Sequence, residues 1–97
     1  MATDKKKREL VFITVIGNDQ KGIVARISAV LFKAGINIED IIQKIFDRYF
    51  VMCMLVDVRS AGISMDRLQQ KLEQETKAMG LRIQIQHENI FSMMHRI

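Results

Sequence analysis

The sequence has a single cysteine, no tryptophan, and no apolar run long enough to span a membrane. The lone thiol, Cys53, excludes a disulfide within the chain and any cysteine-rich metal site. It lies in an apolar run, which indicates a buried structural thiol, because burial disfavours the reactive thiolate. The N-terminus lacks the apolar stretch of a signal peptide, so the sequence predicts a cytoplasmic protein.

Residues suited to catalysis or metal binding are also few. His87 and His95 stand eight positions apart without a repeated carboxylate spacing, so ordinary surface or strand positions are the preferred interpretation for both. No nucleophile–base pair, pair of catalytic carboxylates or metal cluster stands out in the sequence. We therefore expect no catalytic residues, no metal site and no cofactor.

The positive charge is concentrated at one end of the chain. The net charge is +4, but residues 9–97 hold 11 basic and 10 acidic side chains, and the run Lys5 to Arg8 supplies most of the excess. The sequence predicts a flexible basic N-terminus over residues 1–8 and one domain over residues 9–97. Such a tail can contact nucleic acid or an anionic surface. With one tyrosine and no tryptophan for base stacking, we expect no specific nucleic-acid binding.

The first half of the chain predicts a strand, a helix and a hairpin. Residues 9–16 are apolar at both odd and even positions, which indicates a strand buried on both faces. Apolar positions then recur at helical spacing until Gly35, which ends the helix. Residues 37–46 fit a strand or a helix equally well by their period. Residues 49–58 form a plainer strand, and Asp47-Arg48 would join the two in a tight turn that lacks the usual glycine.

The second half predicts a helix, a strand and a terminal helix. Ser64 is a good N-cap for a helix whose apolar stripe reaches Met79, and Gly80 ends it. Residues 81–87 alternate strictly between apolar and polar, as a strand with one buried face does. Residues 88–97 carry apolar side chains at helical spacing.

The resulting β-α-β-β-α-β order is that of the ferredoxin-like α+β fold. This fold places two helices on one face of a four-stranded antiparallel sheet, whose middle strands are the first and third. Both of those strands are apolar on both faces, so the uncovered face needs the C-terminal helix, a second subunit, or both to cover it. We predict a homo-oligomer, most simply a two-fold dimer.

A polar loop with two glycines, residues 17–22, joins the first strand to the first helix. The free N–H groups and positive dipole end of that helix can hold a carboxylate or phosphate, and Gly22 lets the anion approach the backbone. Asn18, Asp19 and Gln20 can hydrogen-bond an amino group, so the loop suits a zwitterion. An ordinary helix cap formed by Asn18 or Asp19 is an equally good interpretation.

Two segments of the sequence carry a resemblance to a known family: Gly17-x-Asp19-x-x-Gly22-Ile23-Val24-Ala25, followed by Leu31, and Gly35-Ile36-Asn37-Ile38-Glu39-Asp40-Ile41. They resemble the ACT domain, a small regulatory module of amino-acid metabolism. The resemblance runs from Leu10 to the C-terminus and is strongest to stand-alone ACT proteins of bacteria and archaea. The chain is also similar to the glycine-cleavage regulator and to the ACT half of formyltetrahydrofolate deformylase.

The resemblance implies a strand over residues 37–46 and dimers that bind small molecules, usually amino acids, where subunits meet. In the family, the first loop and the start of the second strand form that site. With Gln20 and Lys21 from the same loop, the candidate ligand site is Asn18, Asp19, Gln20, Lys21, Gly22, Ile23, Asn37 and Ile38. Many members have proline where Lys21 stands here, which leaves the loop less rigid and adds a charge that can bind an anion.

Three functions follow from these observations. The preferred one is a regulatory oligomer that binds a small molecule, an amino acid above all. The second is a structural dimerisation or protein-interaction module without a ligand. The third is an acylphosphatase-like enzyme, because that fold also holds an anion in its first loop with an arginine, and Arg26 follows Gly22 by four residues. No segment matches the asparagine that positions water in that enzyme, so we expect no catalysis.

Overall fold

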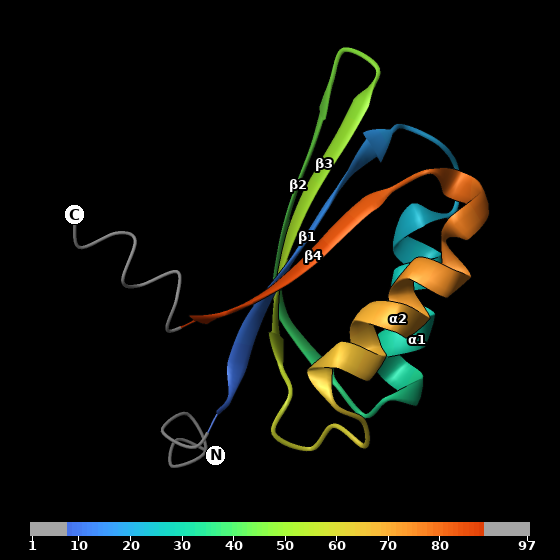
Figure 1. Cartoon of the computed structure of the whole chain (residues 1–97). Helices are drawn as coiled ribbons and strands as arrows, with labels where there is room; N and C mark the ends of the chain where they lie inside the picture. The colour runs from blue at the N-terminus through green and yellow to red at the C-terminus, as the bar shows by residue number, and fades with distance from the viewer. Residues whose placement is uncertain (1–7, 89–97) are drawn as a thin grey trace.

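The computed structural model describes residues 8–88, which follow the order β-α-β-β-α-β. Helices α1 (Ile23–Lys33) and α2 (Met65–Glu75) lie together on one face of a single sheet, with a 3-10 turn, Lys77–Met79, after α2 (Figure 1). The antiparallel sheet has the order β2-β3-β1-β4, and its strands are β1 (Leu10–Asn18), β2 (Asn37–Phe46), β3 (Tyr49–Asp57) and β4 (Arg82–His87). This is the ferredoxin-like fold that the sequence predicts, with β1 and β3 in the middle.

The hydrophobic core lies between the two helices and one face of the sheet. Each central strand turns every second side chain into it, and each helix adds the apolar stripe of an amphipathic helix. Full burial of such a side chain is worth about 1.5–3 kcal/mol, so these contacts dominate the stability of the domain. The fully buried residues are Val11, Ile13, Val15, Ile23, Ile27, Leu31, Met52, Met54, Val56, Leu68 and Leu72.

The second helix is shorter than its apolar stripe predicts. Its α-helical part ends at Glu75, and the 3-10 turn then continues the chain to Met79. Thr76 is 2% exposed, and its Oγ1 donates to the Leu72 carbonyl at 2.8 Å. Such a side-chain bond competes with the backbone ladder, and it stands where the α-helix ends.

The β2–β3 turn forms without a glycine. Asp47 takes its place with a φ of 57°, a left-handed conformation that aspartate adopts more readily than most residues. The helix predicted over residues 88–97 lies outside the described residues, apart from its first residue.

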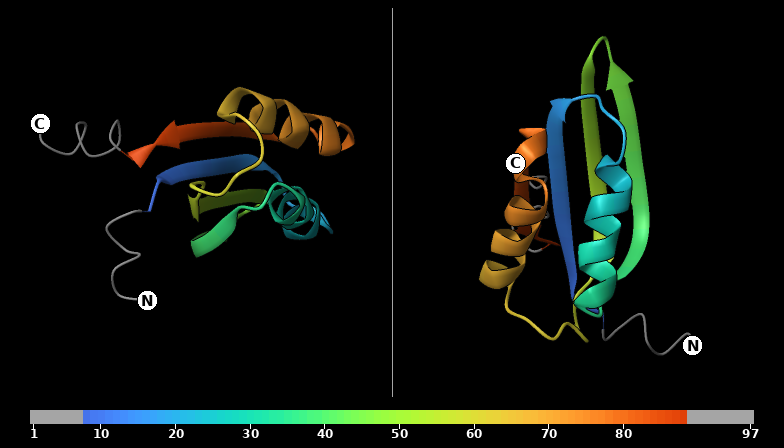
Figure 2. Two further views of the ribbon diagram at one scale, coloured as in Figure 1. Left: turned by 90° about the horizontal axis from the view of Figure 1, so that it is seen from below. Right: turned by 90° about the vertical axis from the view of Figure 1, so that its right-hand side faces the viewer.

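One face of the sheet has no helix over it in the part of the chain that the structure describes (Figure 2). We call it the open face. Its large apolar side chains are between 41 and 71% exposed on β1, β2 and β3, as the sequence predicts for an uncovered apolar face: Ile16, Ile42, Phe46, Tyr49 and Val51. Strand register places the open-face residues in four rows: Asp40–Leu55–Phe12–Gln86, Ile42–Cys53–Thr14–Gln84, Lys44–Val51–Ile16–Arg82 and Phe46–Tyr49.

Candidate functional site

The two glycines of the β1–α1 loop have different roles. Gly17 lies against Leu81, whose Cδ2 would be 2.6 Å from an added Cβ, so a side chain at this position would require Leu81 to move. Gly22 is the N-cap of α1 with a φ of 90°, and an added Cβ would meet nothing within 4 Å. No side chain caps α1, so the interpretation of Asn18 or Asp19 as its cap is wrong. Because no side chain caps them, the first N–H groups of α1 can bind an anion.

Two hydrogen bonds fix the loop to other parts of the fold. The backbone N–H of Asp19 donates to the Arg48 carbonyl at 2.8 Å, which ties the loop to the β2–β3 turn. The side-chain nitrogen of Gln20 donates to the carbonyl oxygens of Met79 and Asn18, at 2.9 and 3.0 Å. Gln20 thus holds the loop in place, whereas the exposed side chains of Asn18 and Asp19 remain at the surface.

The other two candidate residues lie at the opposite end of the sheet. Asn37 is in register with Asp57, and Asp57 is in register with Leu10, at the start of β1. Asn18 ends the same strand eight residues later. At about 3.3 Å per residue, the two ends are about 26 Å apart. A single chain therefore brings the loop candidates together but leaves Asn37 and Ile38 apart from them.

Asn37 lines a small polar hollow of about 170 Å³. Its Nδ2 donates to Glu39 Oε2 at 2.6 Å, and Glu39 Oε1 pairs with Arg8 Nη1 at 2.8 Å. Arg8, the last residue of the basic run, is thus bound to the start of β2. Glu39 was not among the predicted site residues, although a carboxylate two positions after Asn37 lies on the same side of a regular strand.

A buried carboxylate, that of Asp57, lies at this end of the sheet. Asp57 is 5% exposed and accepts hydrogen bonds from the backbone N–H groups of Glu9 and Arg59, at 3.2 and 3.1 Å. The Arg59 side chain also pairs with it at 3.2 Å. Asp57 is thus fully engaged, whereas the Asn37 amide oxygen and the remaining lone pairs of the Glu39 carboxylate can still accept from a ligand.

Two further groups of interest in the described part of the chain are the Cys53 thiol and the Arg26 guanidinium. Burial raises the pKa of the Cys53 thiol, which lies on the open face. Arg26 Nη1 reaches the Glu75 carbonyl of α2, at 3.5 Å. Among residues 8–88, no three His, Cys, Asp or Glu side chains are grouped to hold a metal ion. No helix in the same range has the length and apolar character needed to cross a bilayer.

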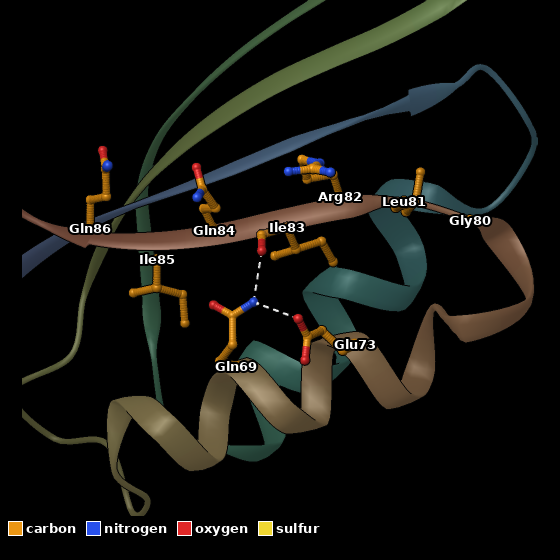
Figure 3. A pocket seen from close by; sticks show the side chains of 9 residues that line it. All are labelled: Gln69, Glu73, Gly80, Leu81, Arg82, Ile83, Gln84, Ile85 and Gln86. Carbon is orange, nitrogen blue, oxygen red and sulfur yellow. Dashed lines mark hydrogen bonds between the residues drawn. The ribbon is translucent and has the colours of Figure 1, made fainter.

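A wide groove runs along the outer edge of β4, beside α2 (Figure 3). It has a volume of about 720 Å³ and a polar lining. Gln69 spans it, because its Nε2 donates to the Ile83 carbonyl at 2.7 Å and to Glu73 Oε2 at 3.0 Å. None of the predicted ligand residues lines this groove.

An ACT domain family model matches residues 9–86. The chain belongs to the ACT domain family. A UPF0237 protein from Methanocaldococcus jannaschii is 46% identical over 87 residues, which cover 90% of this ACT domain chain and 97% of that protein. The solved structure of an ACT domain protein from Streptococcus pneumoniae superposes with a TM-score of 0.73 at 33% identity, covering 87% of this chain and 94% of that one.

The same fold recurs in larger proteins. A putative glycine cleavage system transcriptional repressor has a TM-score of 0.68 at 24% identity, covering 81% of this chain and 45% of that one. A formyltetrahydrofolate deformylase from Pseudomonas syringae has a TM-score of 0.76 at 15% identity, covering 82% and 28%. These comparisons confirm the resemblance predicted from the sequence, and at such identities they show the fold alone.

Proposed function

We propose that this ACT domain is a cytoplasmic regulatory module that binds an amino acid between two copies of the chain. The supporting observation is the division of the candidate residues between the two ends of one sheet, about 26 Å apart. A site built from both groups needs a second chain. The protein acts by binding and carries no catalytic step.

The second copy joins at the edge strand β2 in this proposal. Ile41, Ile42, Ile45 and Phe46 of that strand are 38 to 71% exposed, and β2 has a neighbouring strand on one side only. An unpaired apolar edge is a template for another strand. In antiparallel pairing, β2 of the second chain runs opposite to β2 of the first. The two sheets then form one continuous sheet, and the helices of both chains lie on the same face of it. The loop end of each chain then comes to the Asn37 end of the other.

The two ends have complementary chemistry for a zwitterion. On one chain, the N–H groups at Gly22 and the ammonium of Lys21 attract a carboxylate. On the other, the amide oxygen of Asn37 and the carboxylate of Glu39 can accept from an ammonium group, and Asp19 of the first chain can assist. A ligand that contacts both chains stabilises the pair, by about 2.7 kcal/mol at a hundred times its dissociation constant. Binding of the ligand thereby shifts the equilibrium between single chains and dimers toward the dimer.

A mixing experiment tests whether two chains form each site. Gly22→Asp puts a carboxylate at the anion position, where aspartate tolerates the left-handed backbone, and Asn37→Ala removes the other half of the site. Titration calorimetry with each standard amino acid should find a ligand for the natural protein and none for either variant. A refolded equimolar mixture of the two variants should recover binding, because a mixed dimer has one site with both halves intact.

The matched control is Gly80→Asp, which has the same backbone requirement at a φ of 66° and the same open surroundings but lies at no helix N-terminus. It should bind as the natural protein does. If the natural protein binds but the mixture does not, the site lies within one chain and the composite arrangement is wrong.

The alternative is a dimerisation module without a ligand, which the exposed apolar edge of β2 also supports. It becomes the preferred function if no amino acid binds the natural protein while the dimer persists. An acylphosphatase activity has less support, because Arg26 reaches the end of α2. We expect no hydrolysis of an acyl phosphate in a direct assay.

A further inference from the structure

The cation that pairs with Glu39 comes from the chain itself. Arg8 Nη1 lies 2.8 Å from Glu39 Oε1, and the two side chains are only 28 and 22% exposed. The backbone of Glu9 fixes the place of Arg8 in the fold. Its N–H donates to Asp57 Oδ1 at 3.2 Å, and its carbonyl accepts from the Val58 N–H at 2.8 Å. Because these bonds hold the backbone, the Arg8 side chain can leave Glu39 without breaking them.

Glu39 is the extra residue of a β-bulge in the edge strand β2. In the pairing of β2 with β3, Ile38 and Asp40 lie opposite neighbouring residues, so Glu39 between them has no residue opposite. Bulges re-aim side chains and are frequent beside functional sites. Here Asn37 Nδ2 holds Glu39 Oε2 at 2.6 Å, and both residues line the polar hollow of about 170 Å³. The bulge thus presents one carboxylate at the hollow.

A ligand cation and the Arg8 guanidinium cannot both bind this carboxylate well. Asp57, the other carboxylate of the hollow, is already held by two backbone N–H groups and the Arg59 side chain. Glu39 has lone pairs for a further donor, but a second cation placed there lies close to Arg8. Like charges that are partly shielded from water repel strongly. The two cations therefore compete for Glu39.

Arg8 is bound incompletely in this position. Its Nε is buried and has no hydrogen-bond partner among residues 8–88. A buried donor without a partner destabilises the arrangement that buries it, so the exchange of Arg8 for another cation is made easier. The hollow has the volume of about five water molecules at about 30 Å³ each, which is enough for an ammonium or guanidinium group.

From this geometry we propose that the Arg8 guanidinium is a built-in competitor for the cationic group of the ligand. This inference rests on the amino-acid site of the proposed function and states how that site is regulated: the ligand's ammonium group replaces Arg8 on Glu39. The apparent affinity falls with the fraction of chains in which the site is free. If Arg8 is paired about nine-tenths of the time, it raises the apparent dissociation constant about tenfold.

Calorimetric titration with the standard amino acids tests the competition. The amino acid that binds should bind Arg8→Ala about tenfold more tightly than the natural protein, whereas Arg8→Lys keeps the positive charge and should gain much less. Arg67→Ala removes an exposed arginine from α2 and is the matched control, which should bind as the natural protein does. Unchanged or weaker binding by Arg8→Ala would overturn the proposal, because Arg8 would then only support Glu39.

The competition should act on the cation and not on the carboxylate of the ligand. The 2-hydroxy acid that corresponds to the bound amino acid has the same carboxylate but no ammonium group. It should bind Arg8→Ala and the natural protein with equal affinity. A tenfold gain for the hydroxy acid as well would show that Arg8 does not compete with the ammonium group.

A second titration tests Arg8 without any amino acid. Methylguanidinium chloride carries the cationic group of Arg8 alone, and the side-chain amide of Asn37 reports its arrival beside Glu39 in NMR spectra. The amide signal should shift in Arg8→Ala at roughly a tenth of the concentration that the natural protein needs. It should not shift when Glu39→Gln is added to Arg8→Ala. Equal responses of the natural protein and Arg8→Ala would contradict the proposal.

Together the titrations separate the failure of this inference from that of the proposed function. If no amino acid binds either protein but methylguanidinium prefers Arg8→Ala, the competition at Glu39 holds and the amino-acid function is wrong. If an amino acid binds the natural protein and Arg8→Ala equally, the proposed function holds and the competitor role of Arg8 is wrong.

Discussion

The two edge strands of the sheet differ in length, composition and protection. β2 has ten residues, and four of its large apolar side chains are exposed on both faces of the sheet. β4 has six residues, and Gln69 reaches across from α2 to bond the carbonyl of Ile83 at its outer edge. A protein avoids edge-to-edge association by shortening, charging or covering an edge. Here β4 is short and partly covered, whereas β2 is longer and exposes four large apolar side chains, so β2 is the edge that the proposed function assigns to a second chain.

The substitution with the largest expected effect places a charge on the β2 edge. Ile45→Asp removes about 1.5 kcal/mol of apolar burial from each chain, or about 3 kcal/mol for the pair. The dissociation constant of the edge-paired dimer should therefore rise by roughly a hundredfold in sedimentation equilibrium. Gln84→Asp puts the same charge on β4 and should leave that constant unchanged. Equal effects at both strands would show that the two edges do not differ as described.

Exchanging the charges of Asp40 and Lys44 tests the register in which two β2 strands pair. If pairing is centred on Ile42, Asp40 of one chain lies opposite Lys44 of the other, twice in each dimer. Asp40→Lys and Lys44→Asp each create like-charge pairs, which should weaken the dimer roughly tenfold. The double variant restores opposite charges and should recover most of the affinity at low salt. A double variant as weak as either single one would require a different register.

The smallest effect is expected at the protected edge. Gln69→Ala removes the donor from the partly buried Ile83 carbonyl, and loss of such a hydrogen bond costs about 0.5–1 kcal/mol of folding stability. Urea unfolding should show this loss. Gln70→Ala, one position along the same helix and exposed, should change stability far less. Equal losses would mean that the bond across the groove contributes nothing to the domain.

Local patterns predicted the elements of the fold well. Apolar alternation and helical stripes gave the element order, because burial on one face imposes a period of 2 or 3.6 residues. The strand over residues 37–46 was ambiguous by period, since almost all of β2 is exposed and no single face constrains its pattern. The resemblance to the ACT family predicted it correctly. The change from α-helix to a 3-10 turn after Glu75 was missed, because the apolar spacing continues to Met79 through both.

The local structure of the candidate site could be predicted only in part. Gly22 and the start of α1 were identified from the loop sequence, because a glycine before an apolar helix indicates an accessible N-terminus. The hydrogen bond from Gln20 to the Met79 carbonyl could not be predicted, because the two residues are 59 positions apart and become neighbours only after folding. The link from Arg8 to Glu39 spans 31 residues and was missed for the same reason.

The sequence by itself determined the secondary structure, the family and the apolar character of both sheet faces, because these depend on neighbouring residues and their spacing. The tertiary structure alone decided that β4 is protected while β2 is open, and that the candidate ligand residues lie at opposite ends of the sheet. These facts depend on strand order and register, which bring distant segments together and are set by the packing of the whole core.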